Sequence, residues 1–327
     1  MSRSATVIIP THDHGPTLHY AIRSVLNQTV RDFELFIIGD GATREGRGII
    51  QEYVNHDSRL RFFDHPKGPR HGEIYRHQAL LEAKGEIVCY LADDDMWLPG
   101  HIEYMRELLG DSDFAHVLPL AVDPTGKILL HPGTLSRPEC REWIRSGRNF
   151  IPLSAAGHTL AFYRALPDGW RTAPQEIPTD LFMWQQVLNT PGCRGRSGLR
   201  PTLLNFPSSL RKEWSIQQRL DELEEWERKL GHPNFEKTLM LFALEYLTKH
   251  TSNLEIAQAG VEAAGARVAD LETRLKRQAD RTSQLEEGIR SIENTITWRT
   301  RNSLLRIPYL GTFVRQAARV VFGRGSR

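Results

Sequence analysis

The chain has 327 residues, of which 40% are hydrophobic and 25% are charged, with a formal net charge of +2. This composition is typical of a soluble globular protein and excludes a disordered or membrane-spanning chain. Its apolar stretches fall short of the ~20 residues that a membrane helix needs, and the run at residues 7–9 is too short for a signal peptide. Three widely spaced cysteines form neither a disulfide framework nor a metal-binding pattern, so we expect a cytoplasmic protein.

Short apolar strands alternate with helices over the first 91 residues. The strands are expected at residues 6–10, 33–38, 61–64 and 86–91, and the helices between them at 16–28, 44–55 and 72–83. This alternation predicts an α/β fold with a mostly parallel sheet that is covered on both faces. Ligands of such sheets bind beyond the carboxyl ends of the strands, so the polar residues after each strand are the candidates for function.

The middle of the chain has a mixed pattern. We expect strands at residues 115–121, 127–130 and 157–163, and a helix at 179–188. Residues 212–250 have a helical pattern that is interrupted at Gly231-His232-Pro233. Such turn residues end a helix, so the pattern predicts two helices in this region.

From Leu254 onward, apolar residues recur every seven residues in two seams, with charged residues between them. The first seam comprises Leu254, Val261, Val268, Leu275, Thr282, Ile289 and Ile296, and the second comprises Ala257, Ala264, Leu271, Gln278, Leu285 and Ile292. A heptad repeat of this length predicts a coiled coil, and we expect it to join two or three copies of the chain. The alternative is one long helix that packs along its own domain.

Three consecutive aspartates, Asp93, Asp94 and Asp95, directly follow the strand at residues 86–91. Adjacent carboxylates repel one another, and a divalent cation that takes carboxylate oxygens as ligands would offset that repulsion. Mg²⁺ or Mn²⁺ held there would bind a diphosphate and stabilise it as a leaving group. The alternative is a solvated acidic turn that caps the helix beginning near Pro99.

Four segments together resemble glycosyltransferase family 2. They are residues 7–11 (VIIPT), 21–29 (AIRSVLNQT), 32–43 (DFELFIIGDGAT) and 85–95 (GEIVCYLADDD). The resemblance implies a GT-A fold that binds a nucleoside-diphosphate sugar, with a UDP-sugar favoured. A dinucleotide-dependent oxidoreductase would also show the strand and helix alternation, but no Gly-x-Gly-x-x-Gly follows the first strand.

The resemblance also implies a nucleoside site. Thr11 and Asp13 lie in the loop that lines the nucleoside in the family. Asp40 matches the second acid of the family's usual Asp-Asp-Gly, and Gly39 replaces the first. We therefore expect Asp40 to contact the nucleobase, but the glycine at position 39 makes this contact less certain than in the family.

The same resemblance assigns the diphosphate and metal contacts. It implies that Asp93 and Asp94 contact the nucleotide sugar, and that Asp94 and Asp95 bind Mn²⁺ or Mg²⁺. Many relatives have an acid at the position of Ala92. Arg70 and Arg76 are the candidates for the diphosphate, because a guanidinium binds phosphate through two hydrogen bonds. Either arginine alone also fits a surface salt bridge.

Inverting sugar transfer requires a carboxylate that accepts the proton of the attacking hydroxyl. The resemblance makes Asp180, in the segment 178–184 (PTDLFMW) at the start of the helix expected at 179–188, the candidate for this base, and Glu176 is the alternative. Thr179 is expected to cap that helix, and an acid at the helix start also interacts favourably with the dipole. The histidines lack paired ligand spacing, so His12, His14, His71 and His77 are interpreted as loop and surface residues.

The C-terminal residues 297–327 contain seven arginines and no acid, interleaved with large apolar residues. This composition predicts a segment that lies on an anionic membrane surface. Its start, Thr297-Trp298-Arg299, is similar to tails of bacterial glycosyltransferases for cell-surface polysaccharides. The alternatives are nucleic-acid binding, which the large aliphatic residues disfavour, and a packed helical hairpin.

Four parts are therefore expected: a GT-A domain at residues 1–210, a helical extension at 211–250, a coiled coil at 251–296 and a basic membrane-associating tail at 297–327. The predicted protein is a metal-dependent inverting glycosyltransferase of cell-envelope polysaccharide synthesis. It would act on a glycan or lipid-linked acceptor at the inner face of the cell membrane. The alternative is a catalytically decayed GT-A protein that serves as a coiled-coil scaffold, which Gly39 and Ala92 would explain.

Overall fold

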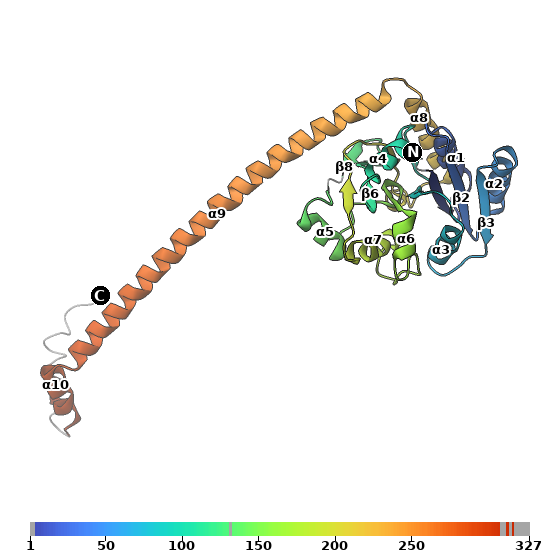
Figure 1. The fold of residues 1–327 in the computed structure, drawn as a ribbon. Helices are drawn as coiled ribbons and strands as arrows, with labels where there is room; N and C mark the ends of the chain where they lie inside the picture. The colour runs from blue at the N-terminus through green and yellow to red at the C-terminus, as the bar shows by residue number, and fades with distance from the viewer. Residues whose placement is uncertain (1–3, 131–132, 308–311, 314–315, 317–327) are drawn as a thin grey trace. The chain divides into compact units, whose positions relative to one another are not determined.

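A computed structural model describes residues 4–130, 133–307, 312–313 and 316 of the chain, without the side chains of residues 252, 296 and 297. The chain divides into two units, Met1–Lys249 and His250–Arg327. Figure 1 shows the elements of each unit. Within the described residues, none of the helices combines the length and the apolar character that crossing a bilayer requires.

Seven strands form the main sheet of the first unit, in the order β10-β6-β9-β4-β1-β2-β3. The strands are β1 (Ala5–Thr11), β2 (Phe33–Asp40), β3 (Leu60–His65), β4 (Ile87–Tyr90), β6 (Phe114–His116), β9 (Ala156–Thr159) and β10 (Gly195–Ser197). Neighbouring strands are parallel except where β9 pairs with β4 and with β6. The predicted α/β fold with a mostly parallel sheet is confirmed.

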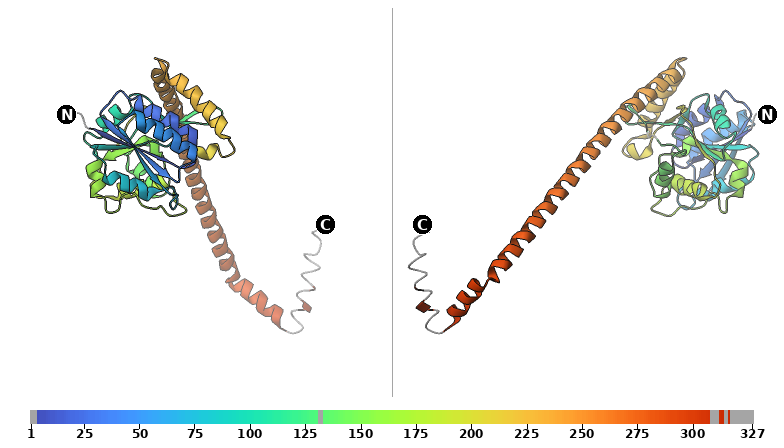
Figure 2. Two further views of the ribbon diagram at one scale, coloured as in Figure 1. Left: turned by 90° about the vertical axis from the view of Figure 1, so that its right-hand side faces the viewer. Right: turned by 60° about the vertical axis from the view of Figure 1, so that its left-hand side comes forward.

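Helices cover both faces of this sheet (Figure 1, Figure 2). Val7 and Ile9 belong to one buried cluster with residues of α1 (Leu18–Leu26), α2 (Arg44–His56) and α4 (His101–Leu108). Ile8 belongs to a second cluster on the other face, formed with α3 (Glu73–Leu81), α5 (Pro138–Arg145), α6 (Leu160–Ala165) and α7 (Thr179–Asn189). Because both faces are buried, β1 is apolar without alternation, which is the pattern expected of a central parallel strand.

A second, smaller sheet has the order β5-β11-β7-β8. Its strands are β5 (Met96–Trp97), β7 (Pro119–Val122), β8 (Ile128–Leu130) and β11 (Leu203–Asn205). Trp226 of α8 (Ile216–Leu230) and Leu239 of α9 (Phe235–Glu293) share a buried cluster with Leu120 and Leu204 of this sheet. The helical extension predicted at 211–250 therefore packs as part of the first unit, and α8 closes over the second sheet.

Two of the predicted strands were wrong in extent. The run at 115–121 contains β6 and β7, which belong to different sheets and are separated at Val117 and Leu118. The run at 157–163 ends as a strand at Thr159, whose hydroxyl oxygen accepts a hydrogen bond from the backbone N–H of Phe162 and caps α6. Short apolar runs do not distinguish a strand from a buried helical turn, and here the threonine cap decides.

The helix α9 is continuous over 59 residues. It begins after the interruption at Gly231-His232-Pro233, as expected, and it continues through residue 250 without a break. It ends at Glu293, and a turn at Asn294 and Thr295 precedes α10 (Ile296–Arg306). The predicted last seam residue, Ile296, thus lies beyond the long helix, and most of the predicted tail after α10 lies outside the described residues.

Candidate active site

A cavity of about 620 Å³ lies where β1, β2 and β4 end. Most of the predicted site residues line it: Thr11, Asp13, Asp40, Arg70, Arg76, Asp93, Asp94 and Asp180. The predicted residues Asp95 and Glu176 do not line it, whereas His12, His14 and His71 do. The fold therefore gathers these side chains at the carboxyl edge of the sheet, where ligands of open α/β sheets bind.

The loop after β1 meets the loop after β4, because these two strands are parallel neighbours. In their register Ile8 lies opposite Tyr90, so the residues after both strands leave the sheet side by side. As a result, Nδ1 of His14 lies 2.6 Å from Oδ1 of Asp93. Burial alone would lower the pKa of His14, but the carboxylate of Asp93, with smaller contributions from Asp94 and Asp13, outweighs burial and raises the pKa to about 9.

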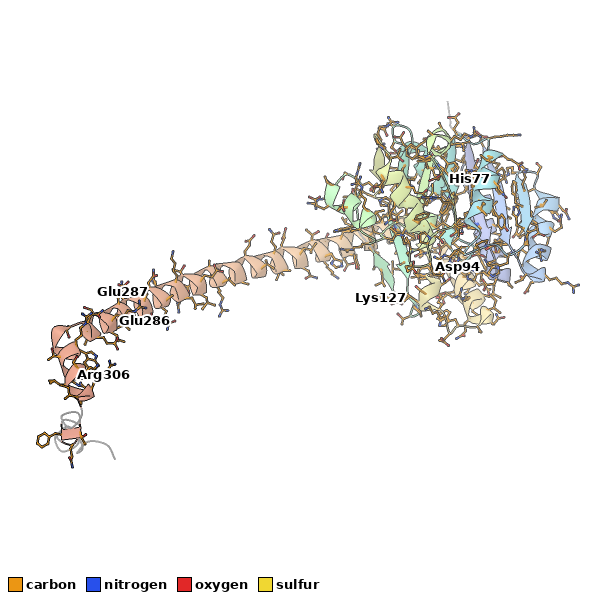
Figure 3. All side chains as sticks on the ribbon, turned by 90° about the horizontal axis from the view of Figure 1, so that it is seen from below. His77, Asp94, Lys127, Glu286, Glu287 and Arg306 are labelled. Carbon is orange, nitrogen blue, oxygen red and sulfur yellow. The ribbon has the colours of Figure 1, made fainter. Side chains whose placement is uncertain are left out.

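Asp94, labelled in Figure 3, is held by residues from the C-terminal part of the first unit. The hydroxyl of Ser208 donates to its Oδ2, and Nη1 of Arg219, on α8, lies 3.6 Å from the same oxygen. The side chain of Arg219 is only 13% exposed. Ser208 and Arg219 were not expected at the site, since nothing in their local sequence distinguishes them from an ordinary turn serine and a helix-surface arginine.

Asp95 has a different environment from its two neighbours. Its carboxylate accepts hydrogen bonds from the hydroxyl of Ser154, from Nδ2 of Asn205 at 3.1 and 3.0 Å, and from the backbone N–H of Phe206 at 2.7 Å. The side chain is 1% exposed. Burial, together with the adjacent Asp94, raises the pKa of Asp95 to about 7. These contacts tie the turn after β4 to the end of β11.

One group of side chains has the geometry of a metal site among the described residues. A ligand atom from each of His14, Asp93 and Asp94 lies within 4.8 Å of the others. Carboxylate oxygens suit Mg²⁺ and Mn²⁺, and an imidazole nitrogen beside them favours the transition metal of the two. The geometry therefore favours this group over the predicted pair Asp94 and Asp95. His14 lies in a loop, as expected, but it also lines the cavity and pairs with Asp93.

Asp40, at the end of β2, is buried and paired. Nζ of Lys67 donates to its Oδ2 at 2.7 Å, and the backbone N–H of Gly68 donates to its Oδ1 at 2.6 Å. At the preceding Gly39 a side chain would need the ring of Phe62 to move, because a Cβ there would lie 3.0 Å from Cε2 of Phe62. The ring of Phe62 thus fills the space that the first acid of an Asp-Asp-Gly sequence would need.

The two predicted arginines have distinct contacts. Arg70 donates through Nη1 to the carbonyl oxygen of Gln175 and through Nη2 to that of Ile177, each at 2.9 Å. It thereby holds the loop that leads into α7. Arg76 is 5% exposed, lies 4.9 Å from the ring centroid of Trp170, and donates through Nη2 to the carbonyl oxygen of His71. Both arginines have a buried Nε without a hydrogen-bond partner among the described residues, but Arg70 uses both of its terminal nitrogens. Of the two, Arg76 has more unused capacity to bind an anion in the cavity.

Asp180 lies in the first turn of α7 and lines the cavity. Its Oδ2 accepts a hydrogen bond from Nδ2 of Asn149 at 3.0 Å, and its Oδ1 accepts one from the N–H of Leu181 at 2.7 Å. Burial raises the pKa of this carboxyl, although both hydrogen bonds oppose the change. Glu176, the alternative base, is exposed and does not line the cavity.

The predicted cap of α7 was wrong. The residue before the helix is Pro178, and Thr179 makes no capping hydrogen bond. The hydroxyl of Thr179 instead donates to Oε1 of the buried Glu73 at 3.0 Å, which joins the start of α7 to the start of α3. This contact, like those of Arg70, fixes the position of the turn that carries Asp180.

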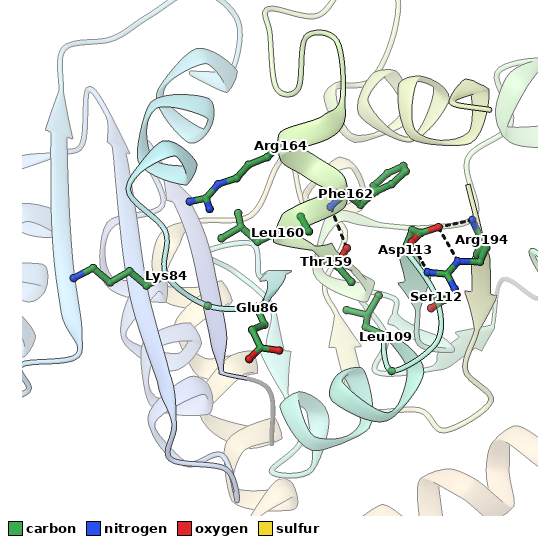
Figure 4. A pocket seen from close by; sticks show the side chains of 13 residues that line it. Lys84, Glu86, Leu109, Ser112, Asp113, Thr159, Leu160, Phe162, Arg164 and Arg194 are labelled. Atoms are coloured by element: carbon green, nitrogen blue, oxygen red, sulfur yellow. Dashed lines mark hydrogen bonds and ion pairs between the residues drawn. The ribbon is translucent and has the colours of Figure 1, made fainter. Parts of the chain in front are cut away.

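A second cavity, of about 540 Å³, lies near the amino end of β4 and is shown in Figure 4. Lys84, Glu86, Arg164 and Arg194 contribute to its lining. Arg194 makes two hydrogen bonds through its guanidinium to Asp113, at 3.1 and 2.8 Å. This cavity contains none of the residues that the sequence predicts for function.

Comparison with known proteins gives one family and a set of relatives. The family model described as "Glycosyl transferase family 2" matches residues 6–163. A GalNAc(5)-diNAcBac-PP-undecaprenol beta-1,3-glucosyltransferase of Campylobacter jejuni is 29% identical over 115 residues, which are 34% of this chain and 36% of the relative. The poly(ribitol-phosphate) beta-N-acetylglucosaminyltransferase TarP of Staphylococcus aureus is 35% identical over 98 residues, 29% of each chain. The similarity thus spans about a third of these curated relatives.

The solved structures show the fold at larger scale. Residues 1–349 of S. aureus TarS superpose with a TM-score of 0.50 at 16% identity, over 62% of this chain and 60% of that fragment. A second crystal structure of the same TarS fragment is a complex with UDP-GlcNAc, and it also has a TM-score of 0.50. At this identity the likeness concerns the fold alone, and it agrees with the predicted GT-A architecture.

Proposed function

Since residues 6–163 belong to glycosyl transferase family 2, we propose that this chain is a metal-dependent inverting glycosyltransferase. It moves a sugar from a nucleoside-diphosphate donor to a glycan or lipid-linked acceptor. The observation that carries the proposal is the cavity at the carboxyl edge of the sheet. It combines an acidic group that suits a divalent cation with a buried arginine and a separate carboxylate, Asp180.

The donor site follows from the charges that line this cavity. Thr11, Asp13 and Asp40 would line the nucleoside, and Arg76 would bind the diphosphate. Arg219, close to Asp94 and nearly buried, adds a second cation where the diphosphate would lie. We favour a UDP-sugar, because the TarS fragment of the same fold was solved with UDP-GlcNAc. The pairing of Asp40 with Lys67 limits what Asp40 itself can recognise.

His14, Asp93 and Asp94 would hold the divalent cation, with Mn²⁺ favoured over Mg²⁺. The cation would replace the proton that His14 carries at neutral pH beside Asp93. The bound cation would neutralise negative charge that develops on the leaving diphosphate. The guanidinium groups of Arg76 and Arg219 would also neutralise negative charge on the diphosphate. With these cations in place, departure of the nucleoside diphosphate needs no general acid.

Asp180 would act as the base. An acceptor hydroxyl that binds beside it can transfer its proton to the carboxylate while the oxygen attacks the anomeric carbon from the face opposite the diphosphate. The hydrogen bond from Asn149 fixes the carboxylate, and the raised pKa brings its basicity closer to that required near neutral pH. Attack from the opposite face inverts the anomeric configuration.

The relatives support an acceptor of the cell envelope. One is named for an undecaprenol-linked glycan and another for poly(ribitol-phosphate). We extend this class to the present chain and place its action at the inner face of the cell membrane. The test is to incubate the full chain with a panel of nucleotide sugars and to measure release of the nucleoside diphosphate with and without Mn²⁺. Release from a UDP-sugar that chelation abolishes is expected, and no release from any donor would contradict the proposal.

The scaffold alternative remains the second candidate, because specific observations favour it. Phe62 lies against Gly39, the family resemblance implies an acid at the position of Ala92 in many members, and Asp40 is paired with Lys67. A decayed enzyme would bind no donor, whereas the intact group of His14, Asp93 and Asp94 favours the enzyme. Donor binding therefore separates the two candidates.

Asp95 gives a prediction that separates a structural role from a metal ligand. Replacing it with alanine leaves the donors of Ser154, Asn205 and Phe206 unpaired in a buried place. We expect the free energy of unfolding to fall by about 2–3 kcal/mol, measured by urea denaturation, because unsatisfied buried groups cost about that much. The folded variant should bind Mn²⁺ and UDP as the unchanged protein does. If the stability is unchanged and Mn²⁺ binding is lost, Asp95 is a metal ligand, as the sequence predicts.

We also propose that the C-terminal helix and tail contact an anionic membrane surface. In α10 the guanidinium of Arg301 lies 4.7 Å from the ring centroid of Trp298, and Leu304 is 39% exposed. Ile307, directly after the helix, is 46% exposed. Arginines beside exposed apolar side chains are typical of surface-bound helices. Residues 254–293 would associate with a second copy of the chain.

The membrane proposal predicts the effect of charge reversal in α10. Changing Arg299, Arg301 and Arg306 to glutamate in the full chain should lower binding to phosphatidylglycerol vesicles by roughly 100-fold, since each arginine contributes about 1 kcal/mol. Vesicle flotation measures the effect, and phosphatidylcholine vesicles are the control that neither protein should bind. Equal flotation of the variant and the unchanged chain would remove α10 as the membrane contact.

A further inference from the structure

The long helix carries an apolar stripe that the described residues of the chain leave exposed. Eight large side chains along it are each between 54% and 72% exposed: Leu254, Val261, Val268, Leu271, Leu275, Leu285, Ile289 and Ile292. All occupy the two seam positions of the heptad repeat. An apolar stripe of this length on a helix, interrupted by Gln278 and Thr282, is the surface along which coiled-coil partners pack.

The charges beside the stripe are sorted by sign. The residues that directly precede the first-seam residues include three arginines, Arg267, Arg274 and Arg281, and the others at this heptad position are uncharged. The residues that directly follow the second-seam residues include three glutamates, Glu272, Glu286 and Glu293, and the others at this heptad position are uncharged. One flank of the stripe is thus basic and the other acidic; Glu286 is labelled in Figure 3.

This sorting fixes the direction of a partner. In a parallel pair, each residue of the basic flank faces the residue of the acidic flank of the other helix whose number is higher by five. Arg267 then meets Glu272 of the second copy, and Arg281 meets Glu286. In an antiparallel pair like flanks face each other, so arginines oppose arginines and glutamates oppose glutamates, which is unfavourable.

The polar seam residues fix the register. When the two copies are aligned without a shift, Gln278 lies opposite Gln278 of the second copy and Thr282 opposite Thr282. A shift of one heptad would place Gln278 opposite a leucine, Leu271 or Leu285, and Thr282 opposite Leu275 or Ile289. Polar seam residues specify register because burying them against apolar side chains leaves them unpaired.

We infer that residues 254–293 form a parallel, in-register coiled coil with a second copy of this chain. The occupant of the apolar stripe is the same helix, selected by the basic and acidic flanks. Arg274, which would face Ala279 in this arrangement, instead pairs with Asp270 of its own helix at 2.9 Å. The parallel direction brings both copies of α10 to one end, which multiplies any weak membrane contact through effective concentration.

Cysteine cross-linking of the full chain tests direction and register together. Val261→Cys and Ile289→Cys, each made with Cys193→Ala, place a thiol near either end of the stripe, ~42 Å apart along the helix at 1.5 Å per residue. Each single variant should form a disulfide between two copies in high yield, because both positions face themselves. Thr273→Cys, on the outer face, is the matched control that should cross-link poorly. An antiparallel pair would let at most one of the two seam cysteines cross-link, which would overturn the inference.

Charge reversal provides the second test, read by sedimentation of the full chain. Arg267→Glu with Arg281→Glu should weaken association by roughly tenfold or more, since attractive pairs become repulsive. Adding Glu272→Arg and Glu286→Arg to the same chain should restore it. Association that the first variant does not weaken would contradict the parallel direction, because in an antiparallel pair the changed flanks would again place like charges opposite each other. A monomeric unchanged chain would show that the stripe serves another partner. Either outcome contradicts the inference, and neither depends on enzymatic activity.

Discussion

Replacing Asp94 with asparagine is expected to lower the rate of sugar transfer by roughly 10³-fold, since stabilisation of the leaving group by a cation contributes several kcal/mol. The amide oxygen of asparagine can still accept the hydrogen bond from Ser208. What is lost is the negative charge in the group formed with His14 and Asp93. The measurement is release of nucleoside diphosphate from the best donor, together with titration of Mn²⁺.

The fold of this variant should be unaffected. Burial raises the pKa of Asp94, so its ionised form is already disfavoured in the folded protein, and removing the charge relieves repulsion with Asp93. Asp111→Asn is the matched control, because Asp111 is an exposed acid that pairs with Arg196 on the surface. A variant at position 94 that binds Mn²⁺ and transfers sugar as well as this control would show that the cation binds elsewhere.

Replacing Asp180 with asparagine is expected to lower turnover by about 10²–10⁴-fold while leaving the affinity for the donor unchanged, because a general base acts on the acceptor. The asparagine keeps an oxygen in place to accept from the N–H of Leu181. Turnover is measured with saturating donor and acceptor, and donor affinity by calorimetry. Loss of donor affinity in this variant would mean that Asp180 helps to bind the donor.

Glu176→Gln is the matched test of the alternative base. Glu176 is exposed and outside the cavity, so its loss should leave turnover unchanged. If turnover instead falls in this variant and survives in Asp180→Asn, the base is Glu176. The pair of variants thus decides between the two carboxylates that the sequence left open.

The pH dependence of the rate gives an independent check on Asp180. A base works only when ionised, and burial raises the pKa of Asp180 above its ordinary value of 3.8. Activity should therefore be present at neutral pH and be lost as the pH falls through this raised pKa. The acid limb of the profile of kcat/KM should lie above the value of an exposed aspartate. A rate that is flat down to pH 4 would contradict a role for this carboxyl.

The architecture of the first unit followed from apolar patterning, because its central strands are buried on both faces. The apolar residues of β1, β2 and β4 mark strands whatever surrounds them, and the polar residues that follow them mark the functional edge. The errors arose where packing decides. At Thr159 a side-chain cap turns an apolar run from strand to helix, and at Val117 the chain passes from one sheet to another.

The sequence predicted which loops line the cavity, but it did not predict which contacts each side chain makes there. The three aspartates are adjacent in sequence, yet Asp93 faces His14, Asp94 faces Ser208 and Asp95 is bonded to β11. These contacts depend on which segments, distant in the sequence, pack beside the turn that carries the aspartates. The local sequence of the turn does not determine that packing. The pairing of β1 with β4 was the available signal for His14, since both loops had to meet.

Calorimetric titration of UDP into the full chain, with and without Mn²⁺ and beside the variant His14→Gln, shows whether this cavity binds a donor through a cation. We predict that UDP binds with Mn²⁺ present, that its affinity falls at least about tenfold when the cation is chelated, and that His14→Gln weakens the dependence on Mn²⁺. Absence of UDP binding under both conditions, or binding that neither chelation nor the variant changes, would contradict the account of this cavity as a cation-dependent donor site.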